Sequence, residues 1–346
     1  MARRSALSAA WLGLMLTTRA LAAELPPPIR IESEVSGHIH PALCVSQKGT
    51  LIATFCQREF KPHLLTRSTD GGKTWSKPTL FPHTRETRVY PGSLTALADG
   101  RIVHAWNVWF EVDGKKSRHV AYSVSRDDGL TWSEPKNLAK NPNPTVHSVI
   151  RHPIVELSPT AWVMALSDRT IVYNPQTGNE SPFGDGRNHG LVPIVRTPKG
   201  TWVSGSGLPA ATSSAQGSAD AGLGLRSTDG GRTWQVIKPF PDVATQGWRH
   251  EMIVLRNGWL IASRIVGPGI GGERIEYVIS RDDGLTWEMD RGVAFYRPGR
   301  PIGGRACPRT VQLDEQTLGT IFYDTAAEQP GGPGVFFRTW PLSRLR

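Results

Sequence analysis

The chain has 346 residues and a formal net charge of +10 at neutral pH, with 12 Trp, 36 Gly and 27 Pro. The positive charge favours anionic partners, but there is no Lys/Arg-rich tract interleaved with aromatic residues, which argues against nucleic acid as a partner. The ten His and three Cys show none of the spacings of a zinc site, so we expect neither a metal nor a cofactor. The Gly, Pro and Trp content is typical of many short strands joined by tight turns.

The first 23 residues have the pattern of a secretory signal peptide. Arg3 and Arg4 precede an apolar run over residues 9–16, and the small residues at 20–23 resemble a cleavage site. The run is too short for a transmembrane helix, and no later stretch could span a bilayer. We therefore predict a secreted or periplasmic protein with one domain over residues 24–346. Its formal charge falls to +7 when the arginines at 3, 4 and 19 leave with the peptide.

One phrase, S-x-D-x-G-x-T-W, occurs four times, at residues 68–75, 125–132, 227–234 and 280–287. The closing tryptophans are 57, 102 and 53 residues apart, and the middle interval is close to two repeats. We therefore expect a decayed fifth copy near residue 181, where residues 174–178 read Asn-Pro-Gln-Thr-Gly. A further step of 53 residues from Trp287 reaches Trp340. This spacing indicates six repeats of one structural unit.

The phrase itself predicts a tight turn between two antiparallel strands. Asp can hydrogen-bond its own backbone, Gly tolerates a positive φ angle, and the Ser and Thr hydroxyls can bond neighbouring backbone groups. The Trp then covers the turn with a large apolar face. We interpret the four copies as architectural and not as catalytic.

Each repeat of about 54 residues has the size of a four-stranded propeller blade. Strand-like segments in the repeats are joined by Asp-Gly and Asn-Gly turns, as at Asp99 and Asn257. The sixth repeat ends after its third strand near Trp340, so we expect residues 29–35 to supply its missing outer strand. The predicted fold is all-β: a monomeric six-bladed β-propeller of four-stranded antiparallel blades, closed by an N-terminal strand in the last blade.

The repeated phrase resembles the Asp box of the sialidase (neuraminidase) superfamily. Over residues 29–346 the chain resembles a secreted bacterial sialidase-like propeller with BNR repeats. The resemblance implies an active site at the starts of the innermost strands, on the face opposite the boxes. Sialidases bind the substrate carboxylate with three arginines, and they use an Asp acid/base and a Tyr nucleophile that a Glu activates. The implied partner is an anionic glycan or a sialylated glycoconjugate.

We call the starts of the six innermost strands the axial openings. They fall at residues 37–41, 88–91, 151–153, 188–190, 248–251 and 305–309. Sixfold repetition should bring these openings to one axis, where Arg and His side chains form a basic funnel that suits a carboxylate or sulfate. Glu251 is the single acid among them.

The resemblance carries over to particular positions. Glu251 resembles the Glu of the Tyr-Glu pair, Arg264 resembles the second substrate arginine, and Glu59 is the acid nearest to the acid/base loop. The chain departs from the family where its first arginine is missing from His38-Ile39-His40-Pro41 and where Cys307-Pro308 stands at the place of the nucleophile. The candidate catalytic residues are Glu251, Glu59 and Tyr90, the candidate substrate-binding residues are Arg88, Arg151, Arg249, Arg264, Arg305, His40, His152 and His250, and Asp168 and Asp324 are further acids at strand ends.

Three functions agree with this pattern. The first is a secreted exo-acting glycoside hydrolase that removes a terminal acidic sugar, with sialic acid as the first choice. The second is a polysaccharide lyase on uronic-acid glycans, in which Arg or His neutralises the carboxylate while Tyr90 or a His abstracts the adjacent proton. The third is a non-catalytic propeller that binds anionic glycans.

Overall fold

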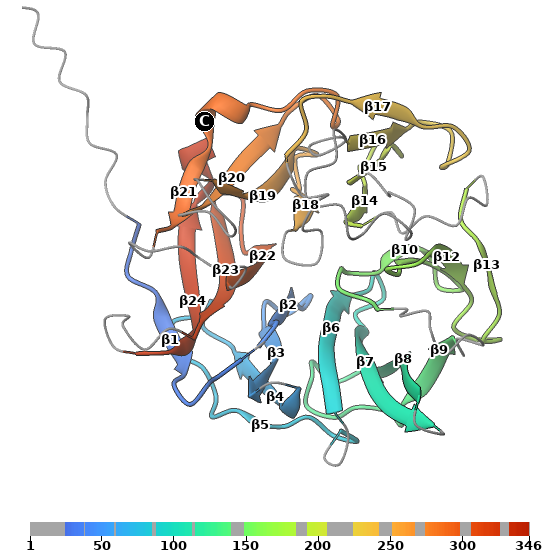
Figure 1. The fold of residues 1–346 in the computed structure, drawn as a ribbon. Coiled ribbons are helices and arrows are strands. Elements are labelled where there is room, and N and C mark those ends of the chain that lie inside the picture. The colour runs from blue at the N-terminus through green and yellow to red at the C-terminus, as the bar shows by residue number, and fades with distance from the viewer. Residues whose placement is uncertain are drawn as a thin grey trace, which may run out of the picture.

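The computed structural model describes residues 25–37, 39–58, 60–84, 88–112, 115–139, 149–184, 192–205, 224–241, 251–266, 274–297, 306–325 and 332–345. These residues form strands and short 3-10 helices, and none of the described elements is an α-helix. The strands make six four-stranded antiparallel sheets. Figure 1 shows the sheets arranged around a central axis like the blades of a propeller. The prediction of an all-β six-bladed propeller is confirmed.

The blades follow one another along the chain. Blade 1 contains β2 (Ala42–Val45), β3 (Leu51–Arg58), β4 (Lys61–Ser68) and β5 (Thr79–Leu80), and blade 2 contains β6 (Arg88–Ala96), β7 (Ile102–Val112), β8 (Lys115–Ser125) and β9 (Lys136–Ala139). Blade 3 contains β10 (Val155–Ser158), β11 (Ala161–Ala165), β12 (Thr170–Tyr173) and β13 (Glu180–Pro182), and blade 4 contains β14 (Ile194–Arg196), β15 (Trp202–Gly205), β16 (Gly224–Ser227) and β17 (Gln235–Ile237). Blade 5 contains β18 (Met252–Val254), β19 (Leu260–Val266), β20 (Arg274–Ser280) and β21 (Val293–Tyr296). The 3-10 helix η2 (Met289–Arg291) lies between β20 and β21.

Blade 6 joins the two ends of the described chain. It contains β22 (Ala306–Gln312), β23 (Thr317–Asp324), β24 (Gly334–Pro341) and, as its outer strand, β1 (Ile29–Glu32). Ile29 pairs with Phe337 and Arg30 with Phe336 across the antiparallel β1–β24 ladder. The chain then ends its described part in the 3-10 helix η3 (Leu342–Leu345). Because β1 covers the edge of β24, blade 6 has four strands like the other blades.

The repeated phrase forms the turn between the third and fourth strands in blades 1, 2, 4 and 5. In the first copy the Ser68 hydroxyl donates to Asp70 Oδ1 at 2.8 Å and accepts from the amide of Gly72 at 2.9 Å. Asp70 also accepts from the amide of Thr74 at 2.9 Å and from its hydroxyl at 2.6 Å. These donors lower the pKa of the exposed Asp70 carboxyl to about 2. The other three copies repeat the same bonds, which explains the fixed spacing of Ser, Asp, Gly and Thr.

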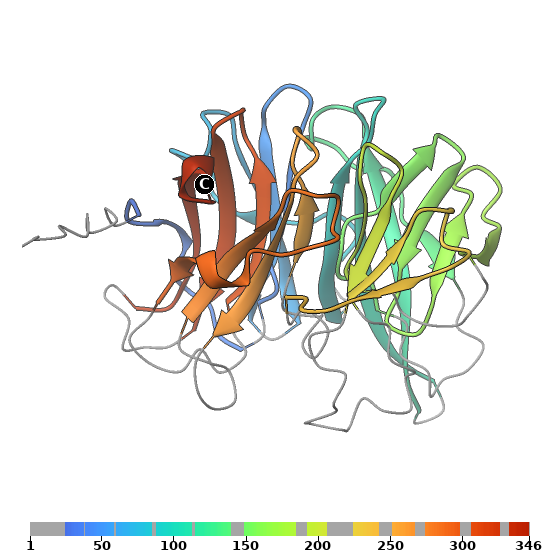
Figure 2. The same cartoon turned by 90° about the horizontal axis from the view of Figure 1, so that it is seen from above.

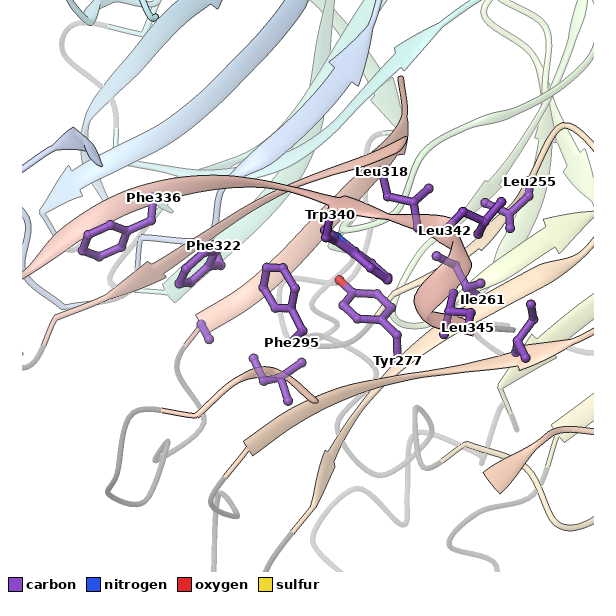
Figure 3. Close-up of a cluster of buried hydrophobic side chains, with 13 residues drawn as sticks. Leu255, Ile261, Tyr277, Phe295, Leu318, Phe322, Phe336, Trp340, Leu342 and Leu345 are labelled. Atoms are coloured by element: carbon purple, nitrogen blue, oxygen red, sulfur yellow. The ribbon is translucent and has the colours of Figure 1, made fainter. Parts of the chain in front are cut away.

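The cores lie between neighbouring blades, because second strands such as β3, β11, β15 and β23 are buried on both faces. Leu51 to Cys56 of β3 form an unbroken buried run, and the all-apolar β11 is buried except at Ala161. Figure 3 shows one such core between blades 5 and 6, built around Tyr277, Phe295 and Trp340. None of the helices formed by the described residues is long and apolar enough to cross a membrane. Residues 1–24, which include the expected signal peptide, lie outside the described residues.

Candidate active site

Side chains from opposite blades meet at the axis of the propeller. Arg309 of blade 6 donates from Nη2 to the carbonyl of Arg151, which precedes β10 of blade 3, at 3.3 Å. Blades 3 and 6 face each other across the ring (Figure 1), so this bond crosses the centre of the molecule. Arg151 in turn donates from Nη1 to the carbonyl of Pro91 in blade 2 at 3.0 Å. The axial openings of blades 2, 3 and 6 therefore converge, as the sixfold repeat predicted.

Both guanidinium groups are buried: Arg151 is 1% exposed and Arg309 is 4% exposed. Burial and the neighbouring charge of Arg151 lower the pKa of Arg309. Its Nη1 donates to the carbonyl of Pro308 at 2.6 Å, while its Nε has no hydrogen-bond partner among the described residues. Two buried guanidinium groups so close together need nearby negative charge.

Glu251 supplies a negative charge to this cluster. It is 3% exposed, and its position next to β18 is fixed by paired backbone and side-chain bonds to Ser263. The carboxylate accepts from the amide of Thr310 at 2.7 Å, from the Thr310 hydroxyl at 2.5 Å and from the Tyr277 hydroxyl at 2.6 Å. Burial raises the pKa of Glu251, while the charge of Arg309 and these hydrogen bonds oppose the rise.

Tyr277 holds Glu251 from the core between blades 5 and 6. Its ring lies between Phe295 and Trp340 with the hydroxyl at one end (Figure 3), and it is fully buried. The hydroxyl also lies 2.7 Å from the Thr310 hydroxyl, which donates to the same carboxylate oxygen. Burial and the Glu251 carboxylate raise the pKa of Tyr277 well above its usual value of 10. A neutral, buried phenol of this kind is suited to positioning Glu251 and poorly suited to nucleophilic attack. We call Arg151, Glu251, Tyr277, Arg309 and Thr310 the axial cluster.

A thiol and an imidazole meet next to the axial cluster. Cys307 Sγ lies 3.4 Å from His40 Nδ1, and both side chains are buried. This contact joins blade 6 to the segment that leads into blade 1. His40, Ala306 and Cys307 adopt positive φ angles of 47°, 82° and 34°, which are unusual for residues with a side chain. Backbone strain of this kind is concentrated at functional sites in proteins. Cys307 thus stands where the family resemblance expected a nucleophile.

Arg264 lies away from the axial cluster. Its side chain pairs with Glu276 at 2.9 Å and donates to the carbonyl of Met289 at 2.6 Å. Arg264 and Glu276 are partners across β19 and β20, and Ser263 and Tyr277 are the next pair. Because successive strand residues point to opposite faces, Arg264 faces away from the side on which Tyr277 contacts Glu251.

The other predicted residues fall into three groups. His152 is buried beside Arg151, Asp168 pairs with Arg169 at 2.8 Å, and Asp324 accepts a hydrogen bond from Tyr296. Arg88 and Tyr90 lie on β6, with only their backbones described. Glu59, Arg249, His250 and Arg305 lie outside the described residues. Among the residues that the structure describes, no group of His, Cys, Asp and Glu is arranged to hold a metal ion.

The sequence interpretation missed Arg309, Thr310 and Tyr277. Arg309 follows Cys307-Pro308 at the axial opening of blade 6, so its place in the repeat already indicated a position near the axis. Tyr277 carried none, because it lies in the middle of an apolar third strand where an aromatic residue is ordinarily part of the core.

Comparison with known proteins agrees with the fold. The BNR/Asp-box repeat family model matches residues 66–77, which is the first of the four turns. The chain is a sialidase-like six-bladed propeller with Asp-box repeats. It is 29% identical over 167 residues to a sialidase of Bacteroides fragilis, and this match covers 39% of the chain and 29% of that sialidase. The matched part is thus less than a third of that relative's length.

Solved structures share the propeller over nearly the whole chain. A Hadza microbial sialidase superposes with a TM-score of 0.67 at 17% identity, covering 91% of this sialidase-like chain and 68% of that protein. An α-L-arabinofuranosidase of Fusarium graminearum superposes with a TM-score of 0.60 at 16% identity, covering 91% of this chain and 98% of that one. At these identities the similarity establishes the fold, and enzymes with different substrates share that fold.

Proposed function

We propose that this protein is an exo-acting glycoside hydrolase that removes a terminal acidic sugar, with sialic acid as the first choice. The observation that supports this most is the charge of the axial cluster, where the buried guanidinium groups of Arg151 and Arg309 lie together and Arg309 acts on the carboxylate of Glu251. Buried guanidinium groups favour an anionic ligand, because a buried charge needs a counter-charge. A substrate carboxylate would supply an acceptor for Arg309 Nε, which has no hydrogen-bond partner among the described residues.

Glu251 is the proposed acid/base of the reaction. Its raised pKa keeps a proton available closer to neutral pH than an exposed carboxyl would, and this suits transfer of a proton to a leaving sugar oxygen. Arg151 and Arg309 are the proposed carboxylate ligands, with His40, His152, Arg88, Arg249, Arg264, Arg305 and His250 as further candidates for substrate contact. Tyr90 and Glu59 remain candidates for nucleophile and second acid. Residues 1–23 would direct this activity out of the cytoplasm.

The decisive experiment measures release of free sugar. Purified protein is incubated with sialosides of 2,3-, 2,6- and 2,8-linkage and with an α-L-arabinofuranoside, and the released monosaccharide is quantified. We expect sialic acid release, and we expect Glu251→Gln to reduce kcat/KM by about a hundredfold or more because a proton-transferring group is lost. Glu180→Gln, which changes a half-exposed carboxylate on the outer strand of blade 3, is the matched control and should keep full activity.

The outcomes separate the alternatives. No sugar release by the wild type from any of these substrates would sink the hydrolase proposal. A uronic-acid glycan is added as a further substrate, and a product from it that absorbs in the near ultraviolet would instead identify lyase chemistry. Full activity in Glu251→Gln, with an unchanged melting temperature, would show that another residue carries the proton.

A further inference from the structure

Each complete Asp box closes the groove between its own blade and the preceding one. A Cβ atom added to the glycine at the fifth position of a box would lie within 3 Å of a side chain of the preceding blade. The four distances are 2.0 Å from Gly72 to Phe337, 2.9 Å from Gly129 to Ile52, 2.7 Å from Gly231 to Phe183 and 2.5 Å from Gly284 to Val203. Three box tryptophans also fill the groove to the preceding blade. Trp75 contacts Phe337, Trp132 contacts Phe81 and Trp287 contacts Phe240, with ring centroids 5.1–5.4 Å apart.

The decayed third box does not close its groove. In blade 1 the amide of Ser76 bonds the carbonyl of Arg67, nine residues earlier, whereas in blade 3 Glu180 pairs with Tyr173, only seven residues earlier. The turn over residues 174–179 is therefore two residues shorter, and it has no tryptophan. The nearest atom to a Cβ added at Gly178 is the hydroxyl of Tyr173 in the same blade, at 3.9 Å. Nothing in this turn replaces the aromatic plug.

A cleft of about 390 Å³ lies where the plug is missing, between blades 2 and 3. Buried Tyr122 and Trp162 form its floor, and Trp132 and Pro175 form apolar walls. Figure 1 shows the outer strands of these two blades, β8–β9 and β12–β13, as neighbours. A volume of this size is within the range of small-ligand sites. The cleft lies at the box end of the blades, whereas the axial cluster lies at the starts of the first strands, so the two are separate.

The rim of the cleft is basic. Arg101, Arg126 and Lys136 line it, and no acidic residue does. Arg101 is paired with Asp99 at 2.6 Å, while Arg126 and Lys136 are exposed and form no ion pair within the described part of the chain. The adjoining hollow contains Asp99 and Asp128, and these carboxylates already hold Arg101 and Arg67. Arg126 also acts on Asp99 through its charge, but neither Arg126 nor Lys136 forms an ion pair within the described part of the chain, so both can pair with an anion. Thr131 and Ser133 add hydroxyls beside them.

We propose that this interblade cleft binds an acidic sugar residue of a glycan chain. The apolar face of a sugar ring would lie against Trp132 and Pro175, and its carboxylate or sulfate would pair with Arg126 and Lys136. Hydroxyls of the ring would bond Thr131 and Ser133. Such a site would hold a glycan on the face of the propeller opposite the axial cluster. Binding there does not depend on whether the axial site hydrolyses a substrate. Exposed ion pairs are individually weak, so the affinity for one sugar residue is modest.

The test uses the full protein and three defined probes: a hyaluronan tetrasaccharide, which carries carboxylates, a heparin tetrasaccharide, which also carries sulfates, and the neutral chitotetraose. Affinities are measured by calorimetry or saturation-transfer NMR. We expect at least one acidic probe to bind and chitotetraose not to bind. The double variant Arg126→Gln/Lys136→Gln should weaken binding at least tenfold. Replacing residues 174–179 with the sequence of residues 68–75 should restore the plug and abolish binding without lowering the melting temperature.

A matched control separates a built site from general electrostatic attraction. Lys73→Gln/Arg232→Gln removes the same charge from two other boxes on the same face, at exposed positions away from the cleft. Its affinity should equal that of the wild type. The proposal is overturned if neither acidic probe binds the wild type, if the control loses as much affinity as the cleft variant, or if the grafted box leaves binding unchanged. The probe that binds more tightly identifies the preferred acidic group.

Discussion

At the scale of single residues, the central feature is a carboxylate held between a phenol and a guanidinium. Tyr277 donates to Glu251 at 2.6 Å, and this bond lowers the pKa of Glu251 against the opposing effect of burial. Tyr277→Phe removes the donor, so the pKa of Glu251 should rise further. The limb of the pH–activity profile that reports Glu251 should then move to higher pH, while kcat falls more than KM changes.

Loss of a buried hydrogen bond also costs about 1–2 kcal/mol of stability, so the profile needs a control. Tyr173→Phe removes the hydroxyl that lies 3.5 Å from that of Tyr122, in a buried pair between blades 2 and 3. It should reduce stability slightly and leave the pH profile in place. A profile that is identical in the wild type and Tyr277→Phe would mean that Tyr277 has no part in positioning the acid.

At the scale of elements, the interface between blades 1 and 2 contains a buried histidine pair that is sensitive to pH. His63 of β4 and His104 of β7 lie with their Nε2 atoms 3.1 Å apart, and His104 Nδ1 lies 2.9 Å from the Ser93 carbonyl. Burial lowers the pKa of His63 well below its usual value and that of His104 to about 4. Both are neutral in the fold at neutral pH, and both take up protons in the unfolded chain below about pH 6.5.

The unfolded state therefore binds more protons than the folded state between about pH 4 and 6.5, and the free energy of unfolding should fall as pH is lowered through this window. The slope from each histidine approaches about 1.4 kcal/mol per pH unit. Chemical denaturation at a series of pH values measures it. His104→Asn should reduce the slope by the contribution of one histidine, and His83→Gln, at an exposed position, should leave the slope unchanged. An unfolding free energy that stays flat from pH 7 to 4.5 would contradict this assignment.

At the scale of the whole molecule, the ring closes through the pairing of β1 with β24. Ile31 packs against the core between blades 6 and 1, and the Arg30 guanidinium lies 5.4 Å from the centre of the Phe336 ring. A chain that begins at residue 34 loses this strand and exposes the edge of β24. Lost ladder bonds and apolar burial should lower the unfolding free energy by about 2–4 kcal/mol.

Thermal unfolding and light scattering measure this effect. The melting temperature should fall by about 5 °C or more, and the shortened protein should aggregate more readily through its free edge. A chain that begins at residue 25 keeps β1 and serves as the control, with an unchanged melting temperature. Equal melting temperatures in both truncations would show that the ring is held closed without β1.

The candidate site was only partly predictable, and particular residues show why. Glu251 and Arg151 stand at axial openings, so the repeat spacing alone brought them to the axis. Arg264 occupies the expected strand, but the alternation of side chains turns it toward Glu276, on the face away from Tyr277. Tyr277 reads as an ordinary core residue in its own strand, and only the packing of blade 5 against blade 6 places its hydroxyl on Glu251.

The sequence by itself determined the number of blades, the box turn in four of them and the antiparallel class of the sheets. It could do so because Ser, Asp, Gly and Thr in one box satisfy one another over a few residues, so their spacing is a local property. Only the tertiary structure decided which charges face each other at the axis and where the shortened third box leaves a groove open. Those contacts join residues from different blades, and their geometry depends on how the blades pack around the ring.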